Sequence, residues 1–227
     1  MTTVVYIYQN DEAVNESIKN LPSNVQVIAV KQLEGTPRTE LVRDEGRVKY
    51  YNRYSLFFRF DEARNDTIRL VKSEWIIMLD EDEFLCATER EIFEMDNINH
   101  KVGGLIFDII SPSVNSSNEI QTSVSRYVRA FRNFGFKYEF RAHEQIAPSI
   151  LDAGYKVIWY PIIIRHYGYL TENYQDFKRL AVKKLMRNLE LNILDYSEIN
   201  DINKKEFLLD AIMNTSKSLI EIRNETK

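Results

Sequence analysis

Residues 75–83 read WIIMLDEDE, an unbroken apolar run that ends abruptly in four acidic residues. Because every position from 75 to 79 is apolar, the run predicts a central strand that is covered on both faces. The acidic residues 80–83 would then stand at the carboxyl end of that strand, where open α/β sheets bind their ligands. This stretch therefore predicts both a buried sheet and a charged site at its edge.

On the amino-terminal side, strand-like and helix-like stretches alternate. Residues 4–8 (VVYIY) and 25–30 (VQVIAV) are rich in the β-branched and aromatic residues typical of strands. Residues 11–21 and 60–75 carry side chains at helical spacing, and a polar segment leads to residues 47–51 (RVKYY). The β-α-β-α-β order predicts an α/β fold with a mainly parallel, doubly wound sheet and right-handed crossovers.

From residue 103 onward the pattern changes to short strand-like runs. They are GGLIFDII, SRYVRAFRN, FKYEFRAHEQI and YKVIWYPIIIRHY, and they predict a mixed or antiparallel extension of the sheet. Residues 171–194 and 204–222 then read as two amphipathic helices. We therefore predict one catalytic α/β domain over residues 1–170 and a helical extension over residues 171–227 that packs on it.

Composition excludes several classes of protein. The 227 residues include 30 Lys and Arg against 34 Asp and Glu, a net charge of −4 that disfavours a nucleic-acid partner. Cys86 is the only cysteine, so no intrachain disulfide and no thiolate metal site can form. The first residues lack a signal-peptide pattern, and no apolar run approaches the roughly 20 residues of a membrane span. We expect a cytoplasmic protein, with peripheral attachment to the inner face of the membrane left open.

The acidic run is the strongest local signal for chemistry. Alternate residues on an extended chain point the same way, so Asp80 and Asp82 could share a divalent cation through oxygen ligands. Two carboxylates about 4 Å apart repel by roughly 4 kcal/mol at an effective dielectric of about 20, which a cation would relieve. The alternative is a solvated acidic turn, and the buried strand before the run favours the site.

Other candidate residues are less specific. His166, His143 and His100 are the three histidines, and a lone histidine is more often structural than a ligand. Glu144 is a candidate general base, with Asp108 as its competitor. Four arginines could supply phosphate contacts, because the guanidinium fork matches phosphate oxygens: Arg64, Arg126, Arg129 and Arg132. The sequence contains no P-loop, no GxGxxG and no GxSxG motif.

Three segments in this order carry a resemblance. They are FDEARNDTIRLVKSEWIIMLDEDEFL, RYVRAFRNFGFKYEFRAHEQI and IRHYGYLTENYQDFKRLAVKKLMRNLEL. From residue 4 to about residue 195 the chain resembles the family 2 glycosyltransferases with a GT-A fold. The branch that it resembles contains bacterial cell-surface sugar transferases and the peptide S-glycosyltransferases of glycocin biosynthesis.

The resemblance implies roles for the candidate residues. Asp80 and Asp82 would form a DxD site for Mg²⁺ or Mn²⁺ and the sugar diphosphate, with Asp82 at the catalytic centre. His166 would be a further metal ligand, Arg64 would lie near the nucleotide, and Glu144 would lie near the acceptor. Arg129 and Arg132 would add phosphate contacts. The reaction would move a hexose from a UDP-sugar, with inversion, to an unidentified acceptor such as a glycan, a lipid-linked glycan or a peptide.

The segment after the second strand departs from the family pattern. Family members carry an Asp there that helps to hold the nucleoside, whereas this chain has VKQLEGTPRTE with Lys31 at that place. Two alternatives to the transferase follow. One is a catalytically silent module that binds a sugar nucleotide or a glycan, and the other is a nucleotidyltransferase, which usually has a Gly-rich basic loop that this sequence lacks.

Overall fold

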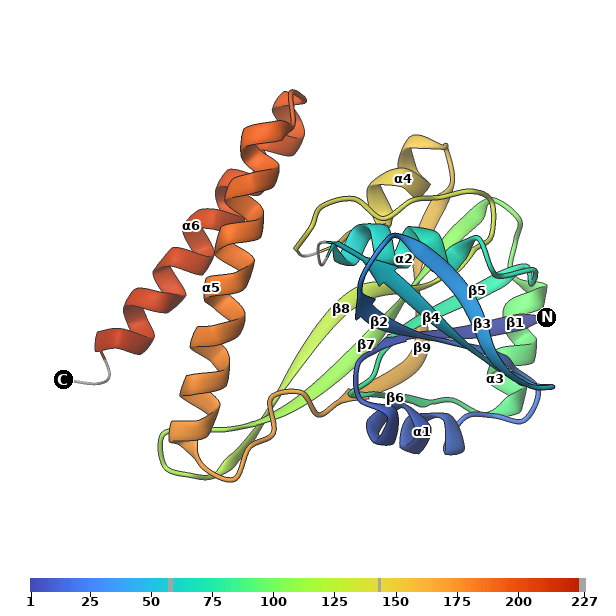
Figure 1. Cartoon of the computed structure of the whole chain (residues 1–227), viewed down its shortest axis with the longest axis horizontal. Helices are drawn as coiled ribbons and strands as arrows, with labels where there is room; N and C mark the ends of the chain where they lie inside the picture. Colours follow the sequence, from blue (N-terminus) through green and yellow to red (C-terminus); the bar gives the residue numbers. More distant parts are fainter. Residues whose placement is uncertain (57–58, 143, 225–227) are drawn as a thin grey trace.

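The computed structural model describes residues 1–56, 59–142 and 144–224. Within them the chain forms a nine-stranded sheet of order β3-β4-β2-β1-β5-β8-β7-β9-β6, flanked by helices (Figure 1). The strands are β1 (Thr2–Tyr8), β2 (Gln26–Glu34), β3 (Arg38–Glu45), β4 (Val48–Ser55), β5 (Trp75–Asp80), β6 (Glu83–Cys86), β7 (Val102–Val114), β8 (Ile120–Arg132) and β9 (Lys156–His166). The helices are α1 (Asp11–Lys19), α2 (Phe60–Ile68), α3 (Glu89–Glu94), α4 (Ala147–Asp152), α5 (Tyr174–Glu198) and α6 (Ile202–Asn224), with a 3₁₀ turn η1 (Met95–Asn97).

The centre of the sheet is parallel, as the sequence predicts. Strand β1 pairs in parallel with β2 on one side and with β5 on the other, and β2 pairs in parallel with β4. All residues of β1 are buried, and so is every residue of β5 before Asp80. The apolar runs therefore form the covered strands that were predicted, with Asp80 at the carboxyl end of β5.

The carboxyl-terminal part of the sheet is mixed, which confirms the predicted extension. Strand β8 pairs antiparallel with both β5 and β7, whereas β9 pairs in parallel with β7. The short strand β6 pairs antiparallel with the end of β9, in a register that sets Glu83 opposite His166. Because β6 follows the acidic run directly, this pairing draws the run and the end of β9 together.

Two segments differ from the sequence-based expectations. Residues 38–45 form the edge strand β3, whose residues are all exposed, so no buried face marks it in the sequence. In place of the expected strand, residues 136–142 and 144–146 form a loop with one isolated bridge between Glu139 and Gln145. The side chain of Asn65 on α2 makes the hydrogen bonds that a neighbouring strand would make. It accepts from the Tyr138 amide at 2.7 Å and donates to the Tyr138 carbonyl at 2.9 Å. Phe140 also has a φ of 70°, which no extended strand continues.

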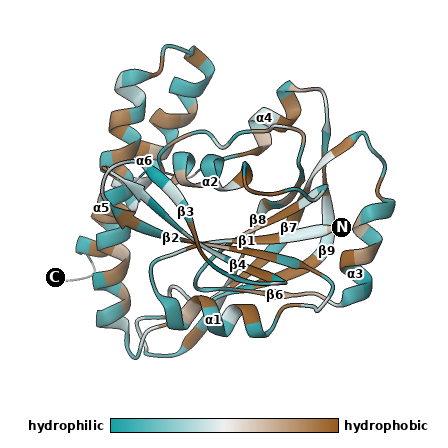
Figure 2. Cartoon of the chain, turned by 45° about the vertical axis from the view of Figure 1, so that its right-hand side comes forward, coloured by the Kyte–Doolittle hydropathy of each residue, from teal (hydrophilic) through white to brown (hydrophobic). Residues whose placement is uncertain are grey.

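Two apolar clusters lie on the two faces of the sheet, and hydrophobic residues follow the central strands (Figure 2). One cluster joins Val4 and Tyr6 of β1 to α1, and the other joins Val5 and Ile7 to α2. Successive β1 residues therefore alternate between the two faces, because side chains alternate along a strand. Packing on both faces of the sheet holds the ends of the central strands, where the site lies, in place.

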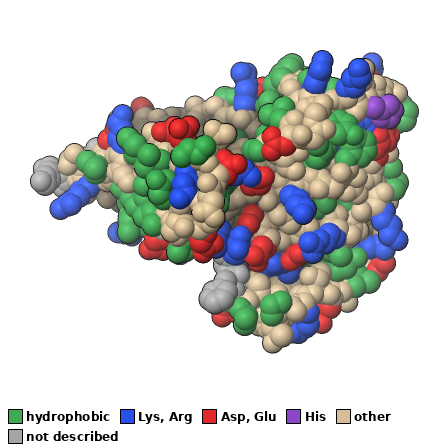
Figure 3. Space-filling view, turned by 90° about the horizontal axis from the view of Figure 1, so that it is seen from above, with side chains coloured by type: hydrophobic (Ala, Val, Ile, Leu, Met, Phe, Trp, Pro, Cys, Tyr) green, Lys and Arg blue, Asp and Glu red, His purple; other side chains and the backbone are tan. Residues whose placement is uncertain are grey.

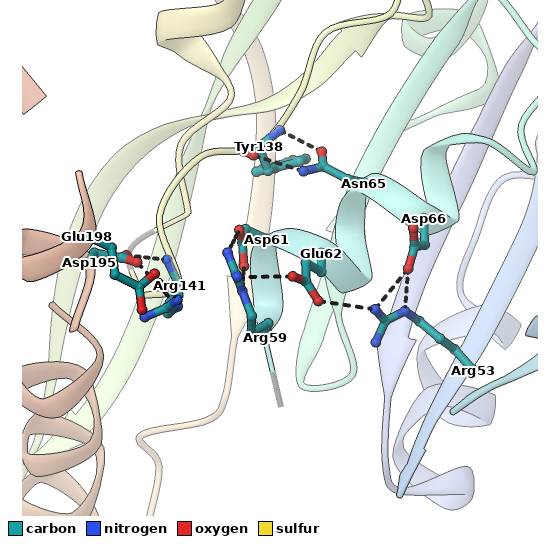
Figure 4. Close-up of polar contacts among 10 residues, drawn as sticks. All are labelled: Arg53, Arg59, Asp61, Glu62, Asn65, Asp66, Tyr138, Arg141, Asp195 and Glu198. Atoms are coloured by element: carbon teal, nitrogen blue, oxygen red, sulfur yellow. Dashed lines mark hydrogen bonds and ion pairs between the residues drawn. The ribbon is translucent and has the colours of Figure 1, made fainter. Parts of the chain in front are cut away.

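Helices α5 and α6 form a hairpin that stands beside the sheet (Figure 1). Its turn is attached to the loop of residues 139–141, where the Arg141 amide donates to Asp195 at 2.6 Å (Figure 4). Lys204 pairs with Glu139 at 2.7 Å, and the rings of Phe140 and Phe207 stack with centroids 4.9 Å apart. The predicted helical extension is present, and the division of the chain at residue 170 stays a prediction.

None of the helices in residues 1–56, 59–142 and 144–224 combines the length and apolar character needed to cross a membrane.

Candidate active site

A cavity of about 1280 Å³ lies between the carboxyl ends of the central strands and the helical hairpin. Its walls come from the ends of β1, β2 and β5, from α2, from the β7–β8 pair and from both helices of the hairpin. Charged side chains of both signs gather where the hairpin meets the rest of the molecule (Figure 3). The cavity lies where the acidic run predicted a site.

Asp80 is held by two arginines at the floor of the cavity. Its Oδ1 accepts from Arg64 Nη2 at 2.9 Å, and its Oδ2 lies 3.9 Å from Arg129 Nη2. Burial opposes the charged form of Asp80, but the charges of Arg64 and Arg129 outweigh it and lower the pKa of this carboxyl. Asp80 is thus an ionised carboxylate whose two oxygens both face guanidinium groups.

Glu83 is a member of the site to which sequence analysis assigned no role. Its side chain is 1% exposed, and its Oε2 accepts from the Asp80 amide at 3.0 Å. Its Oε1 lies 2.5 Å from Arg129 Nη2. Burial raises the pKa of Glu83 to about 7, with Arg129 opposing the shift and Asp80 adding to it. Its role depends on long-range pairing between β6 and β9, which no local pattern reveals.

Arg64 joins Asp80 to Glu144. Its Nε lies 3.2 Å from Glu144 Oε1, and its side chain is buried. The structure therefore brings the expected nucleotide contact, the expected base and the first Asp of the DxD pair into one chain of contacts. Three buried polar atoms beside them have no hydrogen-bond partner within the described part of the chain: Arg64 Nη1, Arg129 Nε and the Tyr138 hydroxyl.

Asp82 and His166 lie side by side. The Asp82 Oδ2 is 3.5 Å from His166 Nε2, and the Tyr167 amide donates to the Asp82 carbonyl at 3.0 Å. Ser111 Oγ lies 3.1 Å from the other ring nitrogen of His166 and orients the ring. Burial opposes the charged form of His166, but the hydrogen bond and charge of Asp82 outweigh it and raise its pKa.

Gly168 keeps space open beside this pair. A Cβ added at Gly168 would clash with Asp82 Oδ2 and would lie 2.7 Å from His166 Nε2. A larger residue there would therefore displace the side chains of Asp82 and His166 from their present positions.

Lys184 reaches the site from α5. It donates to the Gly168 carbonyl at 3.1 Å, and its Nζ lies 4.1 Å from the centre of the Tyr169 ring. Burial lowers the pKa of Lys184, although the nearby Asp82 opposes the shift. Sequence analysis placed this lysine on an amphipathic helix and assigned it no role, since nothing local distinguishes it from Lys183.

The predicted metal-ligand set comes together only in part. Asp82 and His166 are adjacent, whereas Asp80 faces Arg64 and Arg129. Within the described residues, no group of three or more His, Cys, Asp and Glu side chains is arranged to hold a metal ion. A cation here would need further ligands from the bound substrate, so the metal site stays a prediction.

Several expected residues lie elsewhere. Arg132 is fully buried at the amino end of β5 and does not line the cavity. The prediction that it contacts a phosphate is therefore wrong. The competitor base Asp108 pairs with Arg126 at 2.7 Å, and that hydrogen bond lowers its pKa. His100 is exposed, and His143 lies outside the described residues.

Lys31 forms an ion pair with Asp11 and is not part of the cavity wall. The neighbouring residue, Gln32, does line the cavity. The expected loss of a nucleoside contact at Lys31 stays a prediction.

Comparison with known proteins identifies the fold. No protein-family model matches the chain. A TPR repeat-containing protein of Synechococcus elongatus is 27% identical over 146 residues, which are 61% of this chain and 34% of that protein. The chain thus spans about a third of the length of this curated relative.

Among solved structures, GalNAc-T7 with UDP, GalNAc and Mn²⁺ superposes with a TM-score of 0.53. The match covers 97% of this chain and 56% of that chain at 11% identity. The chain has a GT-A glycosyltransferase fold. Residues 1–349 of S. aureus TarS with UDP-GlcNAc match with a TM-score of only 0.43, at 10% identity, over 96% of this chain and 73% of that chain. The predicted fold is confirmed, while family 2 and the glycocin branch stay predictions.

Proposed function

We propose that the protein is a glycosyltransferase that moves a hexose from a UDP-sugar to an acceptor in this cavity. The observation that carries the proposal is the Asp82–His166 pair beside the contact chain of Asp80, Arg64 and Glu144. The Asp82–His166 pair can bind a cation together with the diphosphate. The contact chain ends in the Glu144 carboxylate, which can accept a proton. Both lie at the strand ends where such sheets bind ligands.

The Asp82–His166 pair fits a divalent cation by its donor set. Neighbouring ligands about 2.1 Å from one octahedral ion lie roughly 3 Å apart, and these two ligand atoms are 3.5 Å apart. Because one ligand is an imidazole, Mn²⁺ suits the pair better than Mg²⁺, which prefers oxygen. When bound, the cation stabilises the negative charge of the departing diphosphate.

The arginines and Lys184 provide positive charge around the donor. Arg64 and Arg129 keep Asp80 ionised, so that it can accept hydrogen bonds from hydroxyl groups of the donor. Arg64 Nη1 and Arg129 Nε, which have no partner among the residues that the structure describes, are donors that suit oxygen atoms of the sugar or the phosphates. Lys184 brings a further cation to the departing diphosphate.

Glu144 is the proposed base for the acceptor. A nucleophilic atom of the acceptor forms a bond to the anomeric carbon while the bond from that carbon to the diphosphate oxygen breaks. The electron pair leaves with UDP, and the acceptor proton passes to Glu144. Attack from the face opposite the leaving group inverts the anomeric centre.

Turnover of a panel of nucleotide sugars tests the proposal. Incubation with Mn²⁺ and mixed glycan and peptide acceptors should release UDP from at least one UDP-sugar, and EDTA should abolish the release. Release of pyrophosphate from a nucleoside triphosphate and a sugar phosphate would instead support the nucleotidyltransferase. Binding of UDP without release across a broad acceptor panel would support the silent module.

A further inference from the structure

The side chain of Gln32 lies at the β2 rim of the cavity and is not used in the chemistry described above. The residue is 7% exposed and follows the last pairing of β1 with β2, between Tyr8 and Lys31. In the strand order β2-β1-β5 it stands two strands away from the end of β5. Two strand spacings amount to roughly 10 Å, about the reach from a diphosphate to the base of its nucleoside.

The orientation of the Gln32 amide is fixed by its partner. Arg53 Nη1 donates to Gln32 Oε1 at 3.1 Å. A guanidinium group has donors only, so the amide oxygen must face it and the amide nitrogen must face away. Arg53 is itself held by Asp66, at 2.9 Å from its Nε and 2.8 Å from its Nη2 (Figure 4).

The amide nitrogen of Gln32 has no acceptor. Its Nε2 is buried and has no hydrogen-bond partner within the described part of the chain. Leaving a buried donor unpaired is costly, and a bound ligand that supplies an acceptor removes the cost. Ile7 and Phe60 line the same cavity and offer apolar surface to a flat ring.

We infer that Gln32 selects the base of the nucleotide by donating a hydrogen bond from Nε2 to the C4 carbonyl of uracil. The inference rests on the proposed function, which places the diphosphate at Asp82 and His166. Uracil and cytosine share the carbonyl at C2 and differ at C4. Cytosine has an amine at C4, which is a donor and meets the amide donor unfavourably.

Gln32, next to Lys31, offers the nucleoside a different contact from the one that the resemblance implies. The acidic residue that the resemblance expects at this strand end accepts a hydrogen bond from the nucleoside. Gln32 donates one instead, because Arg53 occupies its oxygen. Recognition therefore turns from the hydroxyl and N–H groups of the nucleoside to its carbonyl groups.

Calorimetry of UDP and CDP binding with Mn²⁺ tests the inference in wild type, Gln32→Leu and Gln32→Asn. Wild type should bind UDP at least about tenfold more tightly than CDP. Gln32→Leu keeps the volume but removes the donor, and should bring the two affinities within about threefold. Gln32→Asn draws the donor back by one methylene and should lower the ratio by itself if the Leu variant does not fold. The matched control is Lys31→Ala, which should keep the wild-type ratio.

Two results overturn the inference while UDP binding survives. One is equal affinity of wild type for UDP and CDP, and the other is an unchanged preference in both Gln32 variants. Failure of wild type to bind any nucleoside diphosphate with Mn²⁺ would instead reject the proposed function, and this inference with it.

Discussion

Two arginines three residues apart on β8 have opposite environments. Arg132 is fully buried, and each of its guanidinium nitrogens has a partner: Nε donates to the Val102 carbonyl at 3.0 Å, Nη2 to the Ile98 carbonyl at 2.6 Å, and Nη1 to Glu74. The guanidinium also lies 4.5 Å from the ring centre of Trp75. Arg132 therefore has a structural role, because it ties the amino end of β5 to the residues before and at the start of β7.

Arg129 is directed to the carboxyl end of β5 and is only partly paired. Its Nη2 contacts Glu83 and Asp80, and its Nε is buried without a partner among the described residues. A guanidinium whose nitrogens are all paired with the protein has a structural role, whereas an unpaired buried donor calls for a partner such as a ligand. On one strand, pairing therefore separates Arg132, a structural arginine, from Arg129, whose spare donor agrees with the proposed role.

The largest loss of activity is expected at Asp82, which follows the carboxyl end of β5. Asp82→Asn should lower kcat/KM by at least about a hundredfold, because the carboxamide is a weak ligand for a hard cation. The melting temperature should stay unchanged, since the side chain is about a third exposed. Kinetics across a Mn²⁺ titration, with thermal unfolding alongside, measure both. Full Mn²⁺-dependent activity of the Asp82→Asn variant would show that Asp82 is not a ligand of the cation.

Glu144→Gln should lower the rate of transfer by roughly 10²-fold or more and leave UDP affinity within about threefold, because a base acts only when a proton leaves. Single-turnover transfer and calorimetry separate the two quantities. The matched control is Asp108→Asn, whose carboxylate pairs with Arg126 and does not line the cavity. Equal losses in transfer and UDP affinity would make Glu144 a binding residue and not a base.

Replacing the two arginines in turn separates their roles. Arg132→Met should destabilise the fold by about 2–4 kcal/mol, because it leaves the carbonyls of Val102 and Ile98 without their donors. Arg129→Met should also destabilise the fold, because it leaves the buried Glu83 without its partner, and it should in addition weaken UDP-sugar turnover about tenfold. Urea unfolding and kcat/KM provide the two readouts. If the folded fractions of both variants lose the same activity, the two arginines do not differ in kind.

The smallest effect is expected at Lys184, which acts from the hairpin. Lys184→Met should weaken UDP binding by about threefold to tenfold, because it removes one charge near the diphosphate and keeps the length of the stem. Calorimetry with Mn²⁺ measures the change, and Lys183→Met, at an exposed position next in the helix, is the control. Equal UDP affinities of the two variants would mean that the charge of Lys184 contributes nothing to UDP binding.

The sequence predicts those features whose cause is local. The apolar runs of β1, β2 and β5 identify buried strands, and the change from apolar to acidic residues at Asp80 identifies the strand end. The edge strand β3 and the short strand β6 escape prediction, because an exposed or four-residue strand carries little hydrophobic pattern.

Roles that depend on distant partners cannot be predicted in this way. Arg129 and Arg132 look alike in the sequence, since their partners come from the acidic run and from the residues around β7. Lys31 and Gln32 differ by one position, and a shift of one residue along a strand reverses the face of the sheet. Only the folded chain shows that Lys31 pairs with Asp11 while Gln32 faces the cavity.

The α5–α6 hairpin gives the cavity a place in the order of biosynthesis. Domains fold as their chain emerges from the ribosome, from the amino terminus onward. Every strand has emerged once β9 is made, so the Asp82–His166 pair can assemble while the wall from α6 is still missing. A nascent chain at that stage carries the charged edge of the sheet open to water. The wall of the cavity is complete only when α6 is in place and Phe207 stacks on Phe140, and α6 follows every strand of the sheet along the chain.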